Sequence, residues 1–146
     1  MYKNEVNIEL ESISNNEAFA RMVTVAFLAP LDPTLDELSD IKTAVSEAVT
    51  NSIIHGYENS SGKIYMNMQL EDNKFTVEIE DKGIGIKDVK KAMEPMYTTK
   101  EEDDRSGMGF CFMEAFMDEL QVLSKPSIGT KIIISKYINK IDFDKE

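Results

Sequence analysis

Two polar residues at helical spacing have side chains that could assist a reaction at a phosphate. Glu47 and Asn51 are four residues apart in a segment whose apolar residues recur with a helical period, so both should lie on one face of a helix. A glutamate can accept a proton from an attacking hydroxyl group or water, and an asparagine oxygen can bind Mg²⁺. His55 follows one turn later beside the helix-ending Gly56, where capping or packing is the more ordinary role. A stripe that only faces water has the same spacing, so the pattern alone leaves both interpretations open.

A second candidate site is the stretch Asp81-Lys82-Gly83-Ile84-Gly85-Ile86. It follows residues 75–80, whose apolar members alternate as in a half-buried strand, so Asp81 is expected at a strand end. Its carboxylate could accept a hydrogen bond from the exocyclic amine of a nucleotide base, while Gly83 and Gly85 leave room for the ring. An Asp followed by glycines is also common in plain turns, and this motif alone does not separate the two interpretations.

A third candidate lies in residues 96–110. Residues 96–107 have no apolar period and are interpreted as a mobile loop or lid. The stretch Gly107-Met108-Gly109-Phe110 should open a helix that reaches about Glu119, and glycines there would expose backbone N–H groups to an anion at the positive end of the helix dipole. Lys100 and Arg105 stand just upstream, which favours a phosphate site.

Two capping-box patterns predict where the helices that carry these residues begin. The first, Ser14-Asn15-Asn16-Glu17, opens a helix that should end before Pro30. The second, Thr34-Leu35-Asp36-Glu37, opens a long helix that should run to Gly56. Arg21 is the only basic residue of the first helix, and it could be a solvated charge or a contact for a partner.

Alternating apolar and polar residues predict five strands, at residues 5–11, 64–70, 75–80, 120–124 and 130–137. The second and third should form a hairpin, and a short helix is expected at about residues 89–93. The run Ile132-Ile133-Ile134 suggests that the last strand is covered on both faces. The first strand could lie at an edge of the sheet and pair with a second copy of itself, which makes a homodimer a simple hypothesis.

The composition predicts one domain over residues 1–146, with a charged tail at about 138–146. The formal net charge of −11 disfavours nucleic acid or an anionic membrane as a main partner, because both require a basic face. The single Cys111 excludes an intrachain disulfide and fits a reducing compartment. No secretory signal is visible, and the longest apolar run is too short to span a bilayer. A cytoplasmic location is therefore expected.

Four motifs occur in the order of the N, G1, F and G2 boxes of the GHKL (histidine-kinase-like) ATP-binding superfamily. They are Glu47-x-x-x-Asn51, Asp81-x-Gly83-x-Gly85, residues 94–100 and Gly107-x-Gly109. Residues 16–21, 31–34, 45–51, 54–57 and 105–110 further resemble the family of sporulation anti-sigma-F factors, and the likeness extends from about Asn4 to Tyr137. The resemblance implies the GHKL (Bergerat) fold, an α/β two-layer sandwich with helices packed on one face of a mixed, mostly antiparallel sheet.

The resemblance also implies roles for individual residues. Glu47 would be the general base, Asn51 the Mg²⁺ ligand, and Arg21 a contact for protein partners. Asp81 would bind the amino group of adenine, with Gly83 and Gly85 shaping that pocket and Thr130 assisting the same contact. The residues that would line the phosphates of ATP from the lid are Lys100, Arg105, Ser106, Gly107, Met108 and Gly109.

The activity implied by the resemblance is that of an ATP- and Mg²⁺-dependent serine kinase. Such proteins hold a sigma factor of the sigma F type inactive and phosphorylate an anti-anti-sigma factor on a serine. A homodimer through the N-terminal strand and helix is the expected assembly. Two alternatives stay open: a kinase of the same fold that serves the general stress sigma factor, and a nucleotide-gated module that sequesters its partner without significant kinase activity.

Overall fold

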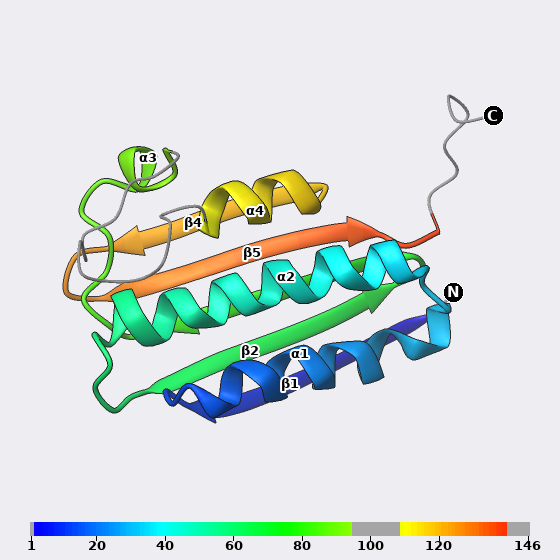
Figure 1. Cartoon of the computed structure of the whole chain (residues 1–146), viewed down its shortest axis with the longest axis horizontal. Helices are drawn as coiled ribbons and strands as arrows, with labels where there is room; N and C mark the ends of the chain where they lie inside the picture. The colour runs from blue at the N-terminus through cyan, green and yellow to red at the C-terminus, as the bar shows by residue number, and fades with distance from the viewer. Residues whose placement is uncertain (1, 95–108, 140–146) are drawn as a thin grey trace.

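A five-stranded sheet with helices on one face forms the body of the protein (Figure 1). The computed structural model describes residues 2–94 and 109–139. The strand order is β1-β2-β3-β5-β4, and all four neighbouring pairs within these residues are antiparallel. The predicted two-layer sandwich is confirmed. The sheet is fully antiparallel in the part of the chain that is described, so the parallel pairing of a mixed sheet is not found there.

The strands follow the predicted alternation closely. They are β1 (Lys3–Glu11), β2 (Lys63–Glu71), β3 (Lys74–Asp81), β4 (Glu119–Lys125) and β5 (Gly129–Tyr137). In β2 and β3 every second residue is buried and faces the helices, because successive side chains of a strand point to opposite faces. β1 pairs with β2 on one side and forms an edge of the described sheet, as predicted.

Helix α2 lies across the middle of the sheet, between α1 and α4 (Figure 1). The helices are α1 (Asn15–Leu28), α2 (Leu35–Asn51), α3 (Val89–Ala92) and α4 (Gly109–Phe116), with a short 3₁₀ turn at Ala29–Leu31. The apolar stripe of α2 is buried against the sheet and includes Ile41, Val45 and Ala48. No helix within the described residues is long and apolar enough to cross a membrane.

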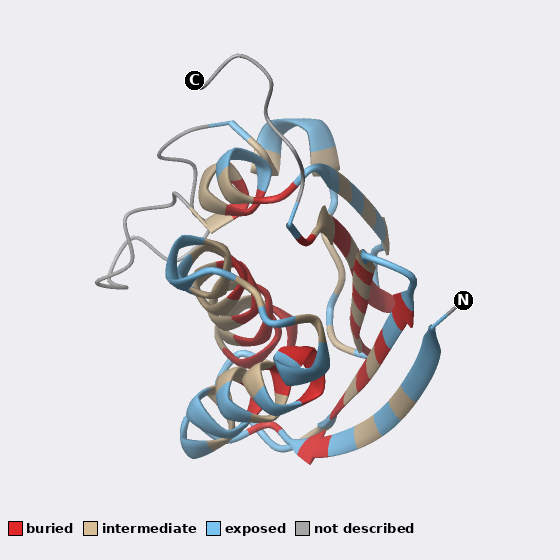
Figure 2. Ribbon diagram, turned by 90° about the vertical axis from the view of Figure 1, so that its right-hand side faces the viewer, coloured by how far each residue is buried: buried red, intermediate tan, exposed pale blue. Residues whose placement is uncertain are grey.

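Two details of the sheet and helix predictions were wrong. Ile133 is half-buried and points to the opposite face from Ile132 and Ile134, which are fully buried. The helices lie on one face of the sheet (Figure 2). The last strand is therefore covered by helices on one face only. The helix that begins at Gly109 ends at Phe116, because the chain enters β4 at Glu119.

Only one of the two predicted capping boxes forms. At the start of α2, the hydroxyl of Thr34 accepts the N–H of Glu37 at 3.1 Å, and the Glu37 carboxylate accepts the N–H of Thr34 at 2.8 Å. At the start of α1, Ser14 is itself in a helical conformation and its side chain makes no cap. Glu17 binds elsewhere: its carboxylate pairs with Arg21 and accepts the hydroxyl of Ser46 on α2.

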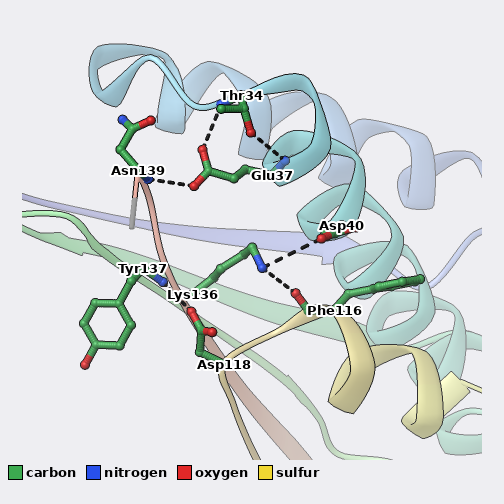
Figure 3. A network of polar contacts seen from close by, with 8 residues as sticks. All are labelled: Thr34, Glu37, Asp40, Phe116, Asp118, Lys136, Tyr137 and Asn139. Carbon is green, nitrogen blue, oxygen red and sulfur yellow. Dashed lines mark hydrogen bonds and ion pairs between the residues drawn. The ribbon is translucent and has the colours of Figure 1, made fainter. Parts of the chain in front are cut away.

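The end of β5 is tied to the start of α2 (Figure 3). Asn139 donates its backbone N–H to Oε2 of Glu37 at 2.6 Å and its side-chain Nδ2 to the carbonyl of Leu31 at 2.8 Å. The Glu37 carboxylate thus accepts hydrogen bonds both from the N-cap residue of α2 and from the residue that follows β5. These bonds fix the beginning of α2 against the strand that runs beneath it.

Lys136 of β5 joins both α2 and α4 to the sheet (Figure 3). Its Nζ donates to the carbonyl of Phe116, the last residue of α4, at 2.8 Å and lies 3.8 Å from Oδ2 of Asp40 on α2. A cation at the carbonyl end of a helix also complements the helix dipole. The C-terminal end of α4 is therefore anchored.

The difference between the two caps can be measured directly. Thr34→Ala should lower the free energy of unfolding by about 1 kcal/mol, because the hydroxyl that accepts the N–H of Glu37 is lost. Ser14→Ala is the matched control and should change it by less than about 0.5 kcal/mol, because its hydroxyl caps nothing. Urea denaturation followed by circular dichroism gives both values. Equal losses for the two variants would contradict the assignment.

Candidate functional site

Asp81 is a buried carboxylate at the end of β3, on the face of the sheet that the helices cover. Its side chain is 2% exposed. Oδ2 accepts the hydroxyl of Ser52 at 2.8 Å, and Oδ1 accepts the backbone N–H of Gly83 at 2.9 Å. Thr130 lies directly opposite on β5. The predicted position of Asp81 at a strand end is therefore confirmed. Because buried carboxylates are uncommon, its burial makes Asp81 a candidate for ligand binding.

Burial raises the pKa of the Asp81 carboxyl above its ordinary value, because removal from water disfavours the charged form. The hydroxyl of Ser52 and the backbone groups of Gly83 and Thr130 act in the opposite direction, since they stabilise the carboxylate. Asp81 has no paired cation among residues 2–94 and 109–139, and a desolvated carboxylate of this kind is well suited to accept a further hydrogen bond from a ligand N–H group.

The last turn of α2 brings Ser52 to this carboxylate. The sequence pattern predicted a regular helix to Gly56, but Ser52–Gly56 form a π-turn, closed by the N–H of Tyr57 on the carbonyl of Ser52 at 2.8 Å. The wider turn removes His55 from the regular i, i+4, i+8 stripe that the pattern suggested. Ser52 was not among the predicted site residues. Its signal is a small polar residue in line with the buried apolar stripe of the helix.

Gly83 and Gly56 are required for a close contact between the loop after β3 and this π-turn. A Cβ atom on Gly83 would collide with the carbonyl of Gly56, and the same carbonyl accepts the N–H of Ile84 at 2.9 Å. A Cβ atom on Gly56 would lie 2.8 Å from the carboxylate of Asp81. The small residues therefore let the backbone of the protein itself approach Asp81.

Gly85 approaches the turn between β4 and β5. Its φ of 74° is left-handed, and a Cβ atom would collide with the carbonyl of Lys125. The hydroxyl of Ser124 accepts the N–H of Ile86 at 2.7 Å and lies 2.7 Å from Oγ1 of Thr130. Thr130 and the loop after Asp81 are thus joined through one serine, which the sequence pattern did not single out.

Glu47 and Asn51 lie one turn apart on α2, as predicted, and both are half-buried. A Cβ atom on Gly109 would lie 3.1 Å from Oε2 of Glu47, so the carboxylate faces the N-terminal end of α4. Ser52, which binds Asp81, is five residues further along, a rise of roughly 7.5 Å on a helix. One helix therefore connects a carboxylate beside a helix N-terminus to the buried carboxylate at the sheet.

The remaining predicted residues of the phosphate end lie outside the described residues: Lys100, Arg105, Ser106, Gly107 and Met108. Gly109 is described and opens α4. Within residues 2–94 and 109–139, no group of three or more acidic, histidine or cysteine side chains is placed to hold a metal ion.

Arg21 lies on α1, apart from the Asp81 site, where it is partly exposed. Its Nε is 2.8 Å from Oε1 of Glu17, and its Nη2 donates a hydrogen bond to Oε2 of the same carboxylate at 3.4 Å. Its neighbours Phe19 and Met22 are 52% and 65% exposed, which is high for large apolar side chains on a helix. Glu17 also binds Ser46, the residue before Glu47, so this surface contacts α2 directly.

Comparison with known proteins gives concordant results. Residues 12–136 match the histidine kinase-like ATPase domain. The chain is 53% identical over 139 residues to the anti-sigma F factor of Bacillus licheniformis, covering 94% of this chain and 95% of that protein. It is 55% identical over 140 residues to the anti-sigma F factor of Clostridium botulinum, covering 95% and 98%, respectively.

A solved structure of the RsbU and RsbW domains of a Mycobacterium tuberculosis protein has a similar fold. The TM-score is 0.68 at 20% sequence identity. The match covers 94% of this chain and 33% of that longer chain. At this identity the likeness supports the fold alone.

The raised pKa of Asp81 predicts how stability depends on pH. The folded chain holds the proton more tightly than the unfolded chain, so Asp81 favours folding at pH below its ordinary value of 3.8, and this contribution is lost as pH rises through the folded value. At neutral pH the carboxylate therefore costs stability. Without ligand, the stability of Asp81→Asn relative to the unmodified chain should increase as the pH rises above the ordinary value of 3.8, and it should level off once the pH exceeds the folded value.

Urea denaturation at a series of pH values, from about 3.5 to about 7.5, measures this difference. Asp32→Asn is the control, because Asp32 is exposed and its left-handed conformation suits asparagine equally well. That variant should show no comparable gain. A stability difference for Asp81→Asn that grows as the pH falls would reverse the predicted sign.

Proposed function

Because the chain belongs to the histidine kinase-like ATPase family, and within it to the branch of the anti-sigma F factors, we propose that it is an anti-sigma factor and an ATP-dependent protein serine kinase. It would hold a sigma factor inactive and phosphorylate an anti-anti-sigma factor on a serine. One observation carries this proposal. Glu47, a proton acceptor, lies on α2 beside the start of α4, and five residues later Ser52 binds Asp81, the carboxylate proposed to bind adenine.

The adenine end of the site is supported by the surroundings of Asp81. Its carboxylate is buried, lacks a paired cation among the described residues and has two donors that hold its orientation, Ser52 and the N–H of Gly83. It would accept a hydrogen bond from the exocyclic amino group of adenine. Thr130 would assist this contact from the neighbouring strand, and Gly83 and Gly85 would keep the loop close enough to shape the pocket.

The phosphate end would be formed by α4 and the residues before it. Gly109 would offer its backbone at the positive end of the α4 dipole. Asn51 would hold Mg²⁺, and the ion when bound would offset phosphate charge. The further proposed ligands of the phosphates are Lys100, Arg105, Ser106, Gly107 and Met108.

Glu47 would act as the general base of the transfer. Its carboxylate would accept the hydroxyl proton of the partner serine while the serine oxygen forms a bond to the γ-phosphorus. The bond from that phosphorus to the bridging oxygen would break, and ADP would leave. The closeness of Glu47 to the start of α4 supports this role, because the phosphates are proposed to bind there.

The partner-binding role is proposed for the surface around Arg21. Arg21 lies on the same helix as the exposed apolar residues Phe19 and Met22, and Arg and large apolar residues are enriched in protein contacts. The exposed edge of β1 supports a homodimer through the N-terminal strand and helix, because an unpaired edge can add a strand. The homodimer stays a hypothesis, as does the choice between sigma factors.

Replacing Glu47 tests the kinase assignment. Glu47→Ala should bind ATP with nearly unchanged affinity and phosphorylate the anti-anti-sigma factor about 10²- to 10⁴-fold more slowly, because only the proton acceptor is lost. Intact mass spectrometry of the partner after incubation with Mg²⁺ and ATP measures the transfer. Glu114→Ala, an exposed carboxylate on α4, is the matched control. ATP binding without any transfer by the unmodified chain would instead favour the nucleotide-gated module.

Replacing Arg21 tests the partner surface. Arg21→Ala should weaken binding of the sigma factor about tenfold or more, because Arg is often a dominant contact, and should leave ATP affinity unchanged. Surface plasmon resonance for the partner and calorimetry for ATP separate the two effects. Lys125→Ala removes an exposed cation from the other edge of the sheet and should change neither. Unaltered sigma binding by Arg21→Ala would refute the assignment.

A further inference from the structure

The hydroxyl of Tyr57 lies between β2 and β3 at the point where their pairing ends. Its Oη accepts the backbone N–H of Lys82 at 2.8 Å and donates to the carbonyl of Lys63. The register of the two strands ends with Ile64 opposite Asp81, and one further step would set Lys63 opposite Lys82. The hydroxyl therefore occupies the place of a main-chain hydrogen bond that would continue the ladder.

The ring of Tyr57 is held in this place from two sides. Tyr57 follows Gly56 directly, so its backbone is fixed by the π-turn. A Cβ atom on Gly62 would collide with the ring, which therefore packs against the main chain of that residue. Across the strand, the ammonium group of Lys82 lies 5.2 Å from the centroid of the Tyr65 ring. Two tyrosines thus hold Lys82, one at its backbone and one at its side chain.

The position of Lys82 determines the donor that orients Asp81. Gly83 is the next residue, and its N–H is the group that binds Oδ1 of Asp81. Gly83 has no room to adjust on its own, because it already touches the carbonyl of Gly56. A displacement of the Lys82 backbone therefore moves the N–H of Gly83 and alters the orientation of the carboxylate.

We infer that Tyr57 is a positioning residue that sets the orientation of the Asp81 carboxylate and thereby the preference of the site for a base with an exocyclic amino group. This inference rests on the proposed adenine contact of Asp81. Without the hydroxyl, the N–H of Lys82 and the carbonyl of Lys63 would bond to each other directly or to water. A direct bond draws the Lys82 backbone toward β2, and a water leaves that backbone without its tie to the fixed Tyr57 ring. Either change loosens the position of the Gly83 N–H and thus the orientation of the carboxylate.

The test compares ATP with inosine triphosphate, which carries an oxygen in place of the amino group. Calorimetry on the full chain gives both dissociation constants for the unmodified protein, Tyr57→Phe, Tyr65→Phe and Asp81→Asn. Tyr57→Phe should weaken ATP binding about 5- to 10-fold and inosine triphosphate binding by less than about twofold. Tyr65→Phe is the matched control, because it removes a hydroxyl from the other ring that contacts the loop and leaves that ring in place. It should keep the preference for ATP.

The outcomes separate this inference from the proposed function. If Asp81→Asn abolishes the preference for ATP and Tyr57→Phe does not, Tyr57 has no positioning role. If Asp81→Asn leaves the preference intact, the adenine contact is wrong, and the inference fails with it. Equal weakening of both nucleotides by Tyr57→Phe would indicate general damage to the fold and would also overturn the inference.

A second variant keeps the test valid if Tyr57→Phe does not fold. Gly62→Ala adds a methyl group where the Tyr57 ring packs, and the ring must move to accommodate it. The same selective loss of ATP affinity is expected from this change, although the hydroxyl is still present. An unchanged ratio of the two dissociation constants in Gly62→Ala would count against the role of Tyr57.

Discussion

The carboxylate of Asp81 is buried between the sheet and the end of α2, and much of the surrounding structure offsets the cost of that burial. A carboxylate removed from water needs hydrogen-bond donors close by. One comes from Ser52, at the start of the π-turn that follows α2, and one from the backbone after β3, so turn and loop must both approach the same two oxygens. The approach is close enough that Gly56 and Gly83 admit no side chain.

The sequence predicts those features of the fold and the site that depend on residues close together in the chain. Alternation placed Asp81 at the end of a strand, and the helical period placed Glu47 and Asn51 one turn apart, because each pattern depends on neighbours in the chain. Ser52 and Tyr57 escaped notice because the groups they bind lie 29 and 25 residues away. The two capping boxes illustrate the same limit. Both match the pattern, but Glu17 has Arg21 and Ser46 as competing partners, and Ser46 belongs to another helix.

The two ends of α2 are held in different ways. At its beginning, a capping box and the backbone of Asn139 fix it against β5. At its other end, contact is made through a side-chain hydroxyl and close backbone packing. Helix α4 has a similar asymmetry, since Lys136 fixes its last carbonyl while its first residue faces Glu47. The anchored ends, the beginning of α2 and the end of α4, lie away from the candidate site. They fix the positions of the two helices that carry its groups.

The π-turn at Ser52–Gly56 makes the residue count of this segment critical. A π-turn fits one more residue into a turn than an α-helix does. Deleting a single residue here could restore a regular helix, with good local hydrogen bonding and helix content. The chain after the turn would keep its direction, because the deleted residue is the one that the wider turn absorbs. What would be lost is the local widening that brings Gly56 against the loop after β3. Relatives without the π-turn should therefore align through this segment with a gap of one residue, while the flanking helix and strand stay in register.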